Sequence, residues 1–386
     1  MYDTIFKKIT DPDNIHFNVQ STNMIHNLTN LIFDSYHVYD TKAVKQQTFH
    51  MEHINNDFMH NIPDFSYYPE DIQTYIQKMK KICITFSFTV HSHDITIYII
   101  TSPKQNIDID KYFEYIYRWL FIATTFSSST CSNKLNIYIT TTDLEKKLPK
   151  NKQQILDQIN CNSAFTTSCK PSTTIHIYRQ EEWFKVFIHE TFHCLGLDFS
   201  HLNQNNCKNI ILSTFPLHID LRLYECYTEL FAEIIYLLFT CCNKRKSIET
   251  VFNLFKKELK QLQIFSFFQC AKILHHYNLT VEQLYKRGSH YIENTPVFSY
   301  YILKSMMLFH FSDFINWCSK HNKTIQFHNT KTNLKDFCIF IKNKIESPKQ
   351  GVYDNIINNT IPIVHDNNDG ISDVYKNLKM TLIEFP

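Results

Sequence analysis

The sequence predicts an α+β protein: a mixed β-sheet with helices in the N-terminal half, a mostly helical C-terminal half, and a cleft between them. Two observations predict it. Between residues 82 and 179, short segments that alternate apolar and polar residues flank a stretch with apolar residues at helical spacing. From residue 218 onward, helical spacing dominates. The 386 residues are enough for two domains or one large one.

We expect four regions along the chain. Residues 1–75 are polar and histidine-rich, and 76–200 alternate between strand and helix patterns. Residues 201–345 read as helical, and 346–386 hold Pro348, Gly351 and Gly370 and are expected to be rich in loops. The expected elements are helices at 21–36 and 70–80, strands at 82–90 and 95–100, a helix at 109–126, strands at 134–140 and 173–179, and helices at 181–196, 218–241, 246–260, 264–276, 280–287, 297–318 and 333–344.

The composition restricts the class of protein. The net charge of +2 gives no reason to expect nucleic acid or a membrane as a partner. The longest apolar run, 230–242, is too short to span a bilayer and carries Glu233. None of the 12 cysteines forms a C-x-x-C pair, and the first residues lack the apolar core of a signal peptide. These features predict reduced thiols and a cytoplasmic location.

The segment His-Glu-Thr-Phe-His at 189–193 contains the residues best suited to bind a metal ion and to transfer a proton. On a helix, His189 and His193 lie one turn apart on the same face, so both imidazoles can reach one ion. Glu190 projects beside them, where it can take a proton from a water that zinc has acidified. Gly196 stands where the helix needs a left-handed residue to end. The alternative is two satisfied core histidines without a metal.

A catalytic zinc needs a third protein ligand. Asp198 and His201 follow the helix closely, but Phe199 stands where the metzincin pattern H-E-x-x-H-x-x-G-x-x-H has its third ligand. The helix pattern at 221–238 offers further candidates for the third ligand. It places carboxylates on one face every four residues within an otherwise apolar helix, where they need partners. These carboxylates are Glu225, Glu229 and Glu233.

The combination of H-E-x-x-H with a glutamate on a later helix resembles the gluzincins, such as thermolysin, among the zincin metallopeptidases. Their second motif, Asn-Glu-x-x-Ser-Asp, reads Tyr-Glu-Cys-Tyr-Thr-Glu here, at 224–229. The resemblance implies a zincin-like fold and one Zn²⁺ per chain, held by His189, His193 and Glu225. It also implies that Glu229 accepts a hydrogen bond from a liganding histidine and fixes its tautomer.

The same resemblance suggests where a substrate binds. Strand 173–179, taken as the sheet edge, would pair with an extended peptide through Ile175, Ile177 and Arg179. Residues 161–166 would line the same cleft. An oxyanion donor is expected from the second half, with Tyr300 or His290 as candidates. Arg179 and Arg222 could hold a terminal carboxylate, and both are equally explained as surface residues.

These observations predict a zinc metallopeptidase acting on peptides or proteins. Glu190 would deprotonate the zinc-bound water, which attacks the peptide carbonyl, and then protonate the leaving amine. The segment 179–193 also resembles predicted metallopeptidases of large cytoplasmic DNA viruses, which implies host cytoplasm or virion as the location. The alternative is a catalytically silent zincin-fold structural or virion-associated protein, in which Cys194 or Cys226 could fill a fourth position on the metal.

Overall fold

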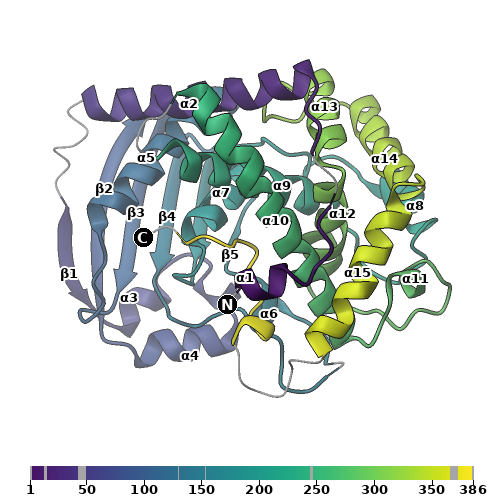
Figure 1. Ribbon diagram of the computed structural model, residues 1–386. Helices are drawn as coiled ribbons and strands as arrows, with labels where there is room; N and C mark the ends of the chain where they lie inside the picture. Colours follow the sequence, from purple (N-terminus) through teal and green to yellow (C-terminus); the bar gives the residue numbers. More distant parts are fainter. Residues whose placement is uncertain are drawn as a thin grey trace.

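The computed structural model describes residues 2–12, 15–41, 49–128, 130–152, 154–243, 247–365 and 373–384. A six-stranded mixed sheet occupies one side of the molecule and a group of helices the other, as Figure 1 shows. The strands run in the spatial order β1-β2-β3-β4-β6-β5. Their bounds are β1 His50–Ile54, β2 Lys81–Val90, β3 His93–Thr101, β4 Lys134–Thr140, β5 Ala164–Thr166 and β6 Ser172–Ile177.

The sheet combines both kinds of pairing. Strands β1, β2 and β3 pair antiparallel, β3, β4 and β6 pair parallel, and β5 returns antiparallel to β6. The prediction that 173–179 is the edge strand is therefore wrong, because β5 pairs with its free side. The three residues of β5 are too few to show an alternating pattern, which hid this strand in the sequence. Strand β1 was also missed, within the polar, histidine-rich region 1–75.

Helices cover both faces of the sheet. Isoleucines of the central strands, including Ile97 and Ile137, pack into the main core with the apolar side chains of α5 (Ile109–Phe126) and α7 (Trp183–Cys194). On the opposite face, Cys83, Ile100 and Tyr138 pack in a second cluster. That cluster is completed by α3 (Asn56–His60), the short 3₁₀ helix Phe65–Tyr67 and α4 (Glu70–Lys78).

The second half is helical, as expected. Its elements are α8 Asn205–Leu212, α9 Leu223–Cys242, α10 Ile248–His276, α11 Val281–Leu284, a π-helical turn Phe298–Leu303, α12 Lys304–Phe309, α13 Phe311–His321, α14 Lys331–Ile345 and α15 Gln350–His365. The prediction of a loop-rich tail is wrong for α15, whose buried Tyr353, Ile357 and Thr360 lie at helical spacing on the side that packs against α10. Residues 366–372, with Gly370, and 385–386 lie outside the described residues.

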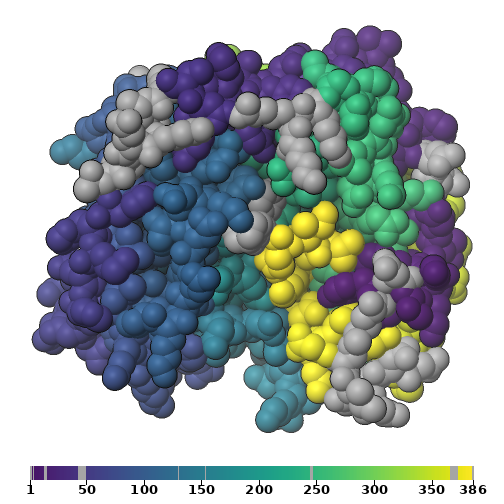
Figure 2. Space-filling model, turned by 60° about the vertical axis from the view of Figure 1, so that its left-hand side comes forward, coloured from purple at the N-terminus to yellow at the C-terminus, as the bar shows by residue number. Residues whose placement is uncertain are grey.

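Two segments join the halves. Helix α2 (Val19–Thr41) runs along the top of Figure 1 and packs on α5 of one half and on α9, α10 and α13 of the other. The segment 376–381 lies between the halves, where Figure 2 shows it in yellow beside the blue sheet half. There the amide of Leu378 donates to Lys146 O at 2.9 Å, and Lys272 Nζ donates to Asn377 O.

Two disulfides join Cys131 to Cys169 and Cys207 to Cys338. The expectation of reduced thiols throughout is therefore wrong for these four cysteines. Their partners lie 38 and 131 residues apart in the sequence, so no local spacing pattern marks them. The eight other cysteines are buried and free. Within the described ranges, no helix combines the length and apolar character needed to cross a membrane.

Candidate metal centre

Helix α7 carries the two histidines and ends immediately after them. Gly196 has φ +66°, in the left-handed region that favours glycine. Its amide donates to His193 O at 3.2 Å, and the amide of Leu197 donates to Phe192 O at 2.8 Å. These two bonds form a Schellman motif, which confirms the predicted helix end. The turn directs the chain back so that Asp198 meets the histidine face.

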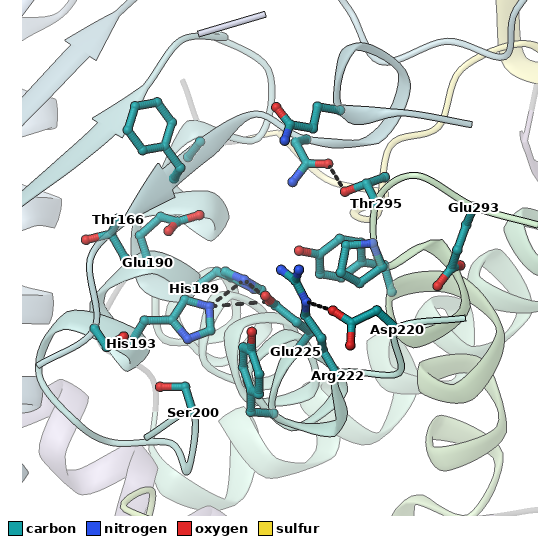
Figure 3. A pocket seen from close by; sticks show the side chains of 18 of the residues that line it. Thr166, His189, Glu190, His193, Ser200, Asp220, Arg222, Glu225, Glu293 and Thr295 are labelled. Carbon is teal, nitrogen blue, oxygen red and sulfur yellow. Dashed lines mark hydrogen bonds and ion pairs between the residues drawn. The ribbon is translucent and has the colours of Figure 1, made fainter. Parts of the chain in front are cut away.

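Three donor atoms converge between α7 and α9. His189 Nε2 lies 3.2 Å from Glu225 Oε2, and His193 Nε2 lies 3.4 Å from the same oxygen. The two Nε2 atoms are 3.1 Å apart. All three side chains are buried, and Figure 3 shows them facing one another at one end of a pocket. Among the described residues, this is the only group of His, Cys, Asp or Glu side chains arranged to hold a metal ion.

Carboxylates occupy the outer nitrogen of each histidine. Asp198 Oδ2 lies 2.6 Å from His193 Nδ1, and Glu229 Oε2 lies 2.9 Å from His189 Nδ1. A carboxylate at Nδ1 holds the proton there and leaves a lone pair on Nε2. In these neutral tautomers, the two Nε2 atoms and Glu225 Oε2 are three electron-pair donors that share a small space.

This donor set fits a metal ion. Three lone pairs at such separations repel one another unless a cation lies between them. Tetrahedral zinc with bonds of about 2.0–2.1 Å holds its ligand atoms about 3.3 Å apart, close to the separations found here. Two imidazoles and one carboxylate also match the ligand types of catalytic sites that keep a position open. His189, His193 and Glu225 could therefore hold a metal ion.

The electrostatics of the site favour a cation. Burial acts to lower the pKa of His193, but Glu225 and Asp198 outweigh it and raise the pKa well above its ordinary value. Burial likewise acts to raise the pKa of Glu225, but the two histidines hold it far below its ordinary range. A buried site that still favours positive charge on its imidazoles has a negative potential, which attracts a metal ion.

A pocket of about 330 Å³ opens beside this group, with Glu190 in its wall. Burial raises the pKa of the Glu190 carboxyl above its ordinary value, although His189 and His193 oppose the shift. A carboxylate with a raised pKa is a better proton acceptor than an ordinary glutamate. Asn162, Ala164, Phe165 and Thr166 also line the pocket, so the expectation that 161–166 borders the cleft is confirmed.

Of the two predicted oxyanion donors, the structure places only one in the pocket. Tyr300 lines the pocket, and its ring centroid lies 6.0 Å from that of His189. His290 does not line the pocket; its Nε2 donates to Tyr277 O at 2.7 Å. Assigning His290 to the site was therefore wrong.

The substrate-binding residues proposed on strand 173–179 are also corrected. Ile175 and Ile177 are fully buried, and their strand is paired on both sides. Arg179 is buried as well, and its guanidinium donates to three backbone carbonyls rather than facing the pocket. These acceptors are Leu144 O, Ile159 O and Asn162 O. All three residues support the fold, and the free edge next to the site is β5.

The alternative metal ligands lie elsewhere. Asp198 is completely buried on the outer nitrogen of His193, and His201 is exposed at the turn. Cys194 and Cys226 are buried and do not belong to the converging group. Phe199 is buried among aromatic rings, including that of Phe327.

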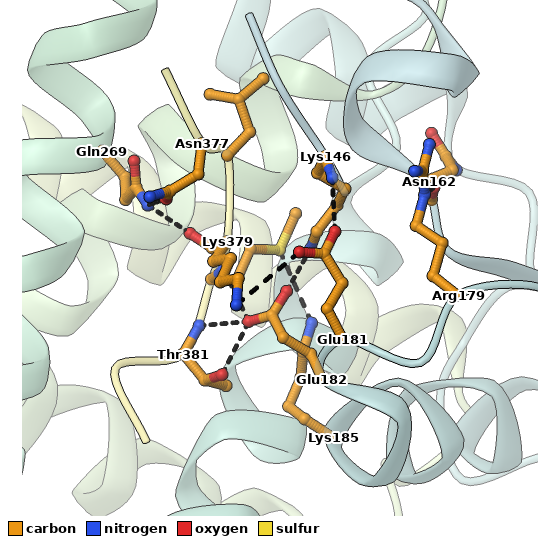
Figure 4. Close-up of polar contacts among 12 residues, drawn as sticks. Lys146, Asn162, Arg179, Glu181, Glu182, Lys185, Gln269, Asn377, Lys379 and Thr381 are labelled. Atoms are coloured by element: carbon orange, nitrogen blue, oxygen red, sulfur yellow. Dashed lines mark hydrogen bonds and ion pairs between the residues drawn. The ribbon is translucent and has the colours of Figure 1, made fainter. Parts of the chain in front are cut away.

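The other two glutamates of α9 are neutralised by lysines. Lys185 Nζ lies 2.7 Å from Glu229 Oε1, and Lys304 Nζ lies 2.6 Å from Glu233 Oε1. Lys185 also neighbours Glu182, which forms an ion pair with Lys146 and accepts from Thr381 Oγ1 at 2.7 Å. Figure 4 shows Glu182 at the centre of these contacts. A chain of alternating charges therefore runs from the candidate metal centre to the segment 376–381.

Sequence reasoning missed Lys185 and the contact of Asp198 with the outer nitrogen of His193, whereas Arg222, which it offered as a candidate for holding a carboxylate, does line the pocket. Lys185 had a signal: it stands four residues before His189, on the same helix face, as Glu229 stands four after Glu225. No family of known proteins, curated protein or solved structure matches this chain.

Proposed function

We propose that the protein is a zinc-dependent metallopeptidase of the gluzincin type, with a zincin-like fold. The observation that carries the proposal is the convergence of His189, His193 and Glu225 with Glu190 in the adjacent pocket wall. The placement of Glu229 on His189 agrees with the role that the gluzincin resemblance implies. The mixed sheet beside α7, followed by the ligand-bearing α9, supports the same fold.

Each residue has a role in the proposed hydrolysis. A zinc ion held here supplies Lewis acidity, which lowers the pKa of a coordinated water and polarises a nearby carbonyl. Glu190 takes a proton in the pocket and delivers it to the leaving amine. Asp198 and Glu229 keep the histidine tautomers that present Nε2 to the ion. The Tyr300 hydroxyl, which burial keeps protonated by raising its pKa, donates to the oxygen on which negative charge develops.

The pocket suits an extended peptide. Strand β5 is an edge strand, and its three residues line the pocket, so a substrate backbone could pair along it. Figure 3 shows Thr166 of β5 beside Glu190, so a peptide bond paired along this edge would lie within reach of Glu190.

Elemental analysis of the purified chain tests the metal. We expect one zinc per chain, and a loss or great weakening of zinc binding in Glu225→Ala. Glu249→Ala is the matched control: it also removes a glutamate from the first turn of a long helix, but an exposed one outside the site. Zinc retained at full affinity in Glu225→Ala would exclude Glu225 as the third ligand.

Hydrolysis is tested separately on a mixed peptide library. Glu190→Gln should keep one zinc and lose peptide cleavage by a factor of about 100 or more, because the proton acceptor is gone while the ligands remain. Glu249→Gln should cleave at the unmutated rate. A Glu190→Gln protein with full activity would overturn the mechanism, and a zinc-loaded unmutated protein without any cleavage would favour a structural role.

A further inference from the structure

We propose that the pocket binds the free C-terminal carboxylate of a peptide at Arg222, so that the site acts as a carboxypeptidase. This proposal rests on the metallopeptidase function above and specifies its substrate class. Among the described residues that line the pocket, Arg222 is the only one with a permanent positive charge. The acidic side chains that line the pocket are Glu190, Asp220, Glu225 and Glu293.

Arg222 stands beside the metal ligands. It occupies the N-cap position of α9, and the amide of Glu225 donates to Arg222 O at 3.2 Å. Figure 3 shows its guanidinium directed into the pocket, next to Glu225. A peptide carboxylate paired with Arg222 would therefore place its neighbouring peptide bonds close to the donor group and Glu190.

Asp220 orients the Arg222 guanidinium through a single nitrogen. Arg222 Nε lies 2.9 Å from Asp220 Oδ2, while Lys208 Nζ lies 2.6 Å from the other oxygen, Oδ1. This contact is on one edge of the guanidinium and leaves the two terminal nitrogens, Nη1 and Nη2, without a partner among the described residues. That pair of nitrogens matches a carboxylate in the bidentate geometry that arginine favours.

The two halves of the protein are joined across one wall of the same pocket. Thr295 Oγ1 donates to Asn162 Oδ1 at 2.7 Å, a bond drawn in Figure 3, and the amide of Asn294 donates to Leu156 O at 3.0 Å. Asn162, Asn294 and Thr295 all line the pocket, so these bonds close it on that side. An endopeptidase must let its substrate continue in both directions, whereas a chain that ends in the pocket needs only one opening.

The reaction is hydrolysis of the last peptide bond. Water adds its oxygen to the carbonyl carbon, the C–N bond breaks, and the nitrogen takes a proton. The products are a peptide shortened by one residue and a free amino acid, with no oxidation or reduction.

Two matched peptide libraries test the proposal on the zinc-loaded chain, one with free C-terminal carboxylates and one with C-terminal amides. Both carry acetylated N-termini, and products are identified by mass spectrometry. We expect loss of single C-terminal residues from the acid library, with kcat/KM about 10- to 100-fold above the amide library. In Arg222→Gln this ratio should fall to near one. Lys208→Gln, which removes the other cation on Asp220 but does not line the pocket, should keep it.

A binding measurement decides the proposal independently of turnover. 2-Benzylsuccinate and its monoamide are titrated into zinc-loaded Glu190→Gln, with and without Arg222→Gln. We expect the diacid to bind about 10-fold or more tightly than the monoamide, and the difference to vanish with Arg222→Gln. Equal affinities, or internal cleavage and equal cleavage of both libraries, would overturn the carboxylate site. Internal cleavage would leave the peptidase function intact, and absence of all cleavage would count against that function instead.

Discussion

Glu229 Oε2 lies 2.9 Å from His189 Nδ1, on the side of the imidazole ring that faces away from Glu225. The other oxygen of Glu229 lies 2.7 Å from Lys185 Nζ. The outer nitrogen of a proposed ligand is thus held by a carboxylate that is itself held by a buried lysine. Burial acts to raise the pKa of Glu229, but Lys185 and His189 lower it well below its ordinary value. Glu229 is therefore ionised and keeps the tautomer of His189 that presents Nε2.

Replacing Glu229 by glutamine should weaken metal binding without removing a ligand. The neutral side chain no longer fixes the tautomer of His189 or raises its basicity, so we expect zinc affinity to fall about 10- to 100-fold. Competition with a chromophoric chelator measures this affinity, and Glu249→Gln is the control. A Glu229→Gln protein with unchanged zinc affinity would show that the contact has no effect on the ligand.

Replacing Lys185 by methionine should destabilise the fold. Lys185 is 2% exposed and balances both Glu229 and Glu182, so the variant leaves buried negative charge without a partner. We expect a loss of about 3–5 kcal/mol in the free energy of unfolding, measured in urea. Lys208→Met breaks an ion pair with the exposed Asp220 and should cost at most about 1 kcal/mol. Similar losses in the two variants would contradict a special role for Lys185.

Glu182 should make stability depend on pH in the acid range. Burial acts to raise its pKa, but Lys146 and Lys185 outweigh burial and lower the pKa to about 2. The folded-state pKa lies below the unfolded value, so the contribution of about 3 kcal/mol is complete above pH 4.5 and is lost as the pH falls through 2.

Urea unfolding of the unmutated chain and of Glu182→Gln, each between pH 7 and pH 3, measures this contribution. Glutamine keeps the shape of the side chain but cannot titrate. The stability difference between the two proteins should shrink by about 2 kcal/mol on going to pH 3. A difference that stays constant over this range would mean that the fold does not hold Glu182 ionised.

Gly196 should tolerate no side chain. Its φ of +66° costs an alanine about 1–2 kcal/mol, and an added Cβ would lie 3.0 Å from Cys131 Sγ in the disulfide. Gly196→Ala should therefore lower the free energy of unfolding by at least this amount and weaken zinc binding, because the turn places Asp198 on His193. Gly351 in α15 is the matched control: its Cβ would meet no atom within 4 Å, so Gly351→Ala should be neutral or stabilising. Thermal unfolding of both variants checks the signs.

Local patterns in the sequence predicted the parts of the site that lie on one helix. The spacing of His189 and His193 places both on one helix face. Gly196 ends the helix because glycine readily adopts the left-handed conformation needed there. The apolar surroundings drew attention to Glu225, Glu229 and Glu233 together, and the resemblance to gluzincins singled out Glu225, which the structure places against both histidines.

The features that the sequence did not disclose depend on pairing between distant segments. Strand β5 is recognisable only from its register on β6, and the disulfides only from the approach of their cysteines in space. Arg179 looked like an exposed strand end, but loops from elsewhere supply carbonyls that surround it. Such features require the tertiary structure, because no local period encodes them.

The segment 376–381 has a consequence for biosynthesis. Met380 and Thr381 donate their amides to Glu182 Oε1, and Leu378 donates to Lys146 O. A ribosome adds these residues after every helix and strand described here, α15 included. Until Met380 and Thr381 are made, Glu182 lies beside Lys146 and Lys185 but lacks the two backbone amides that donate hydrogen bonds to it. Helix α7 therefore receives these contacts only after the other elements have been made, and a nascent chain stalled before residue 377 would carry both histidines on an incompletely supported helix.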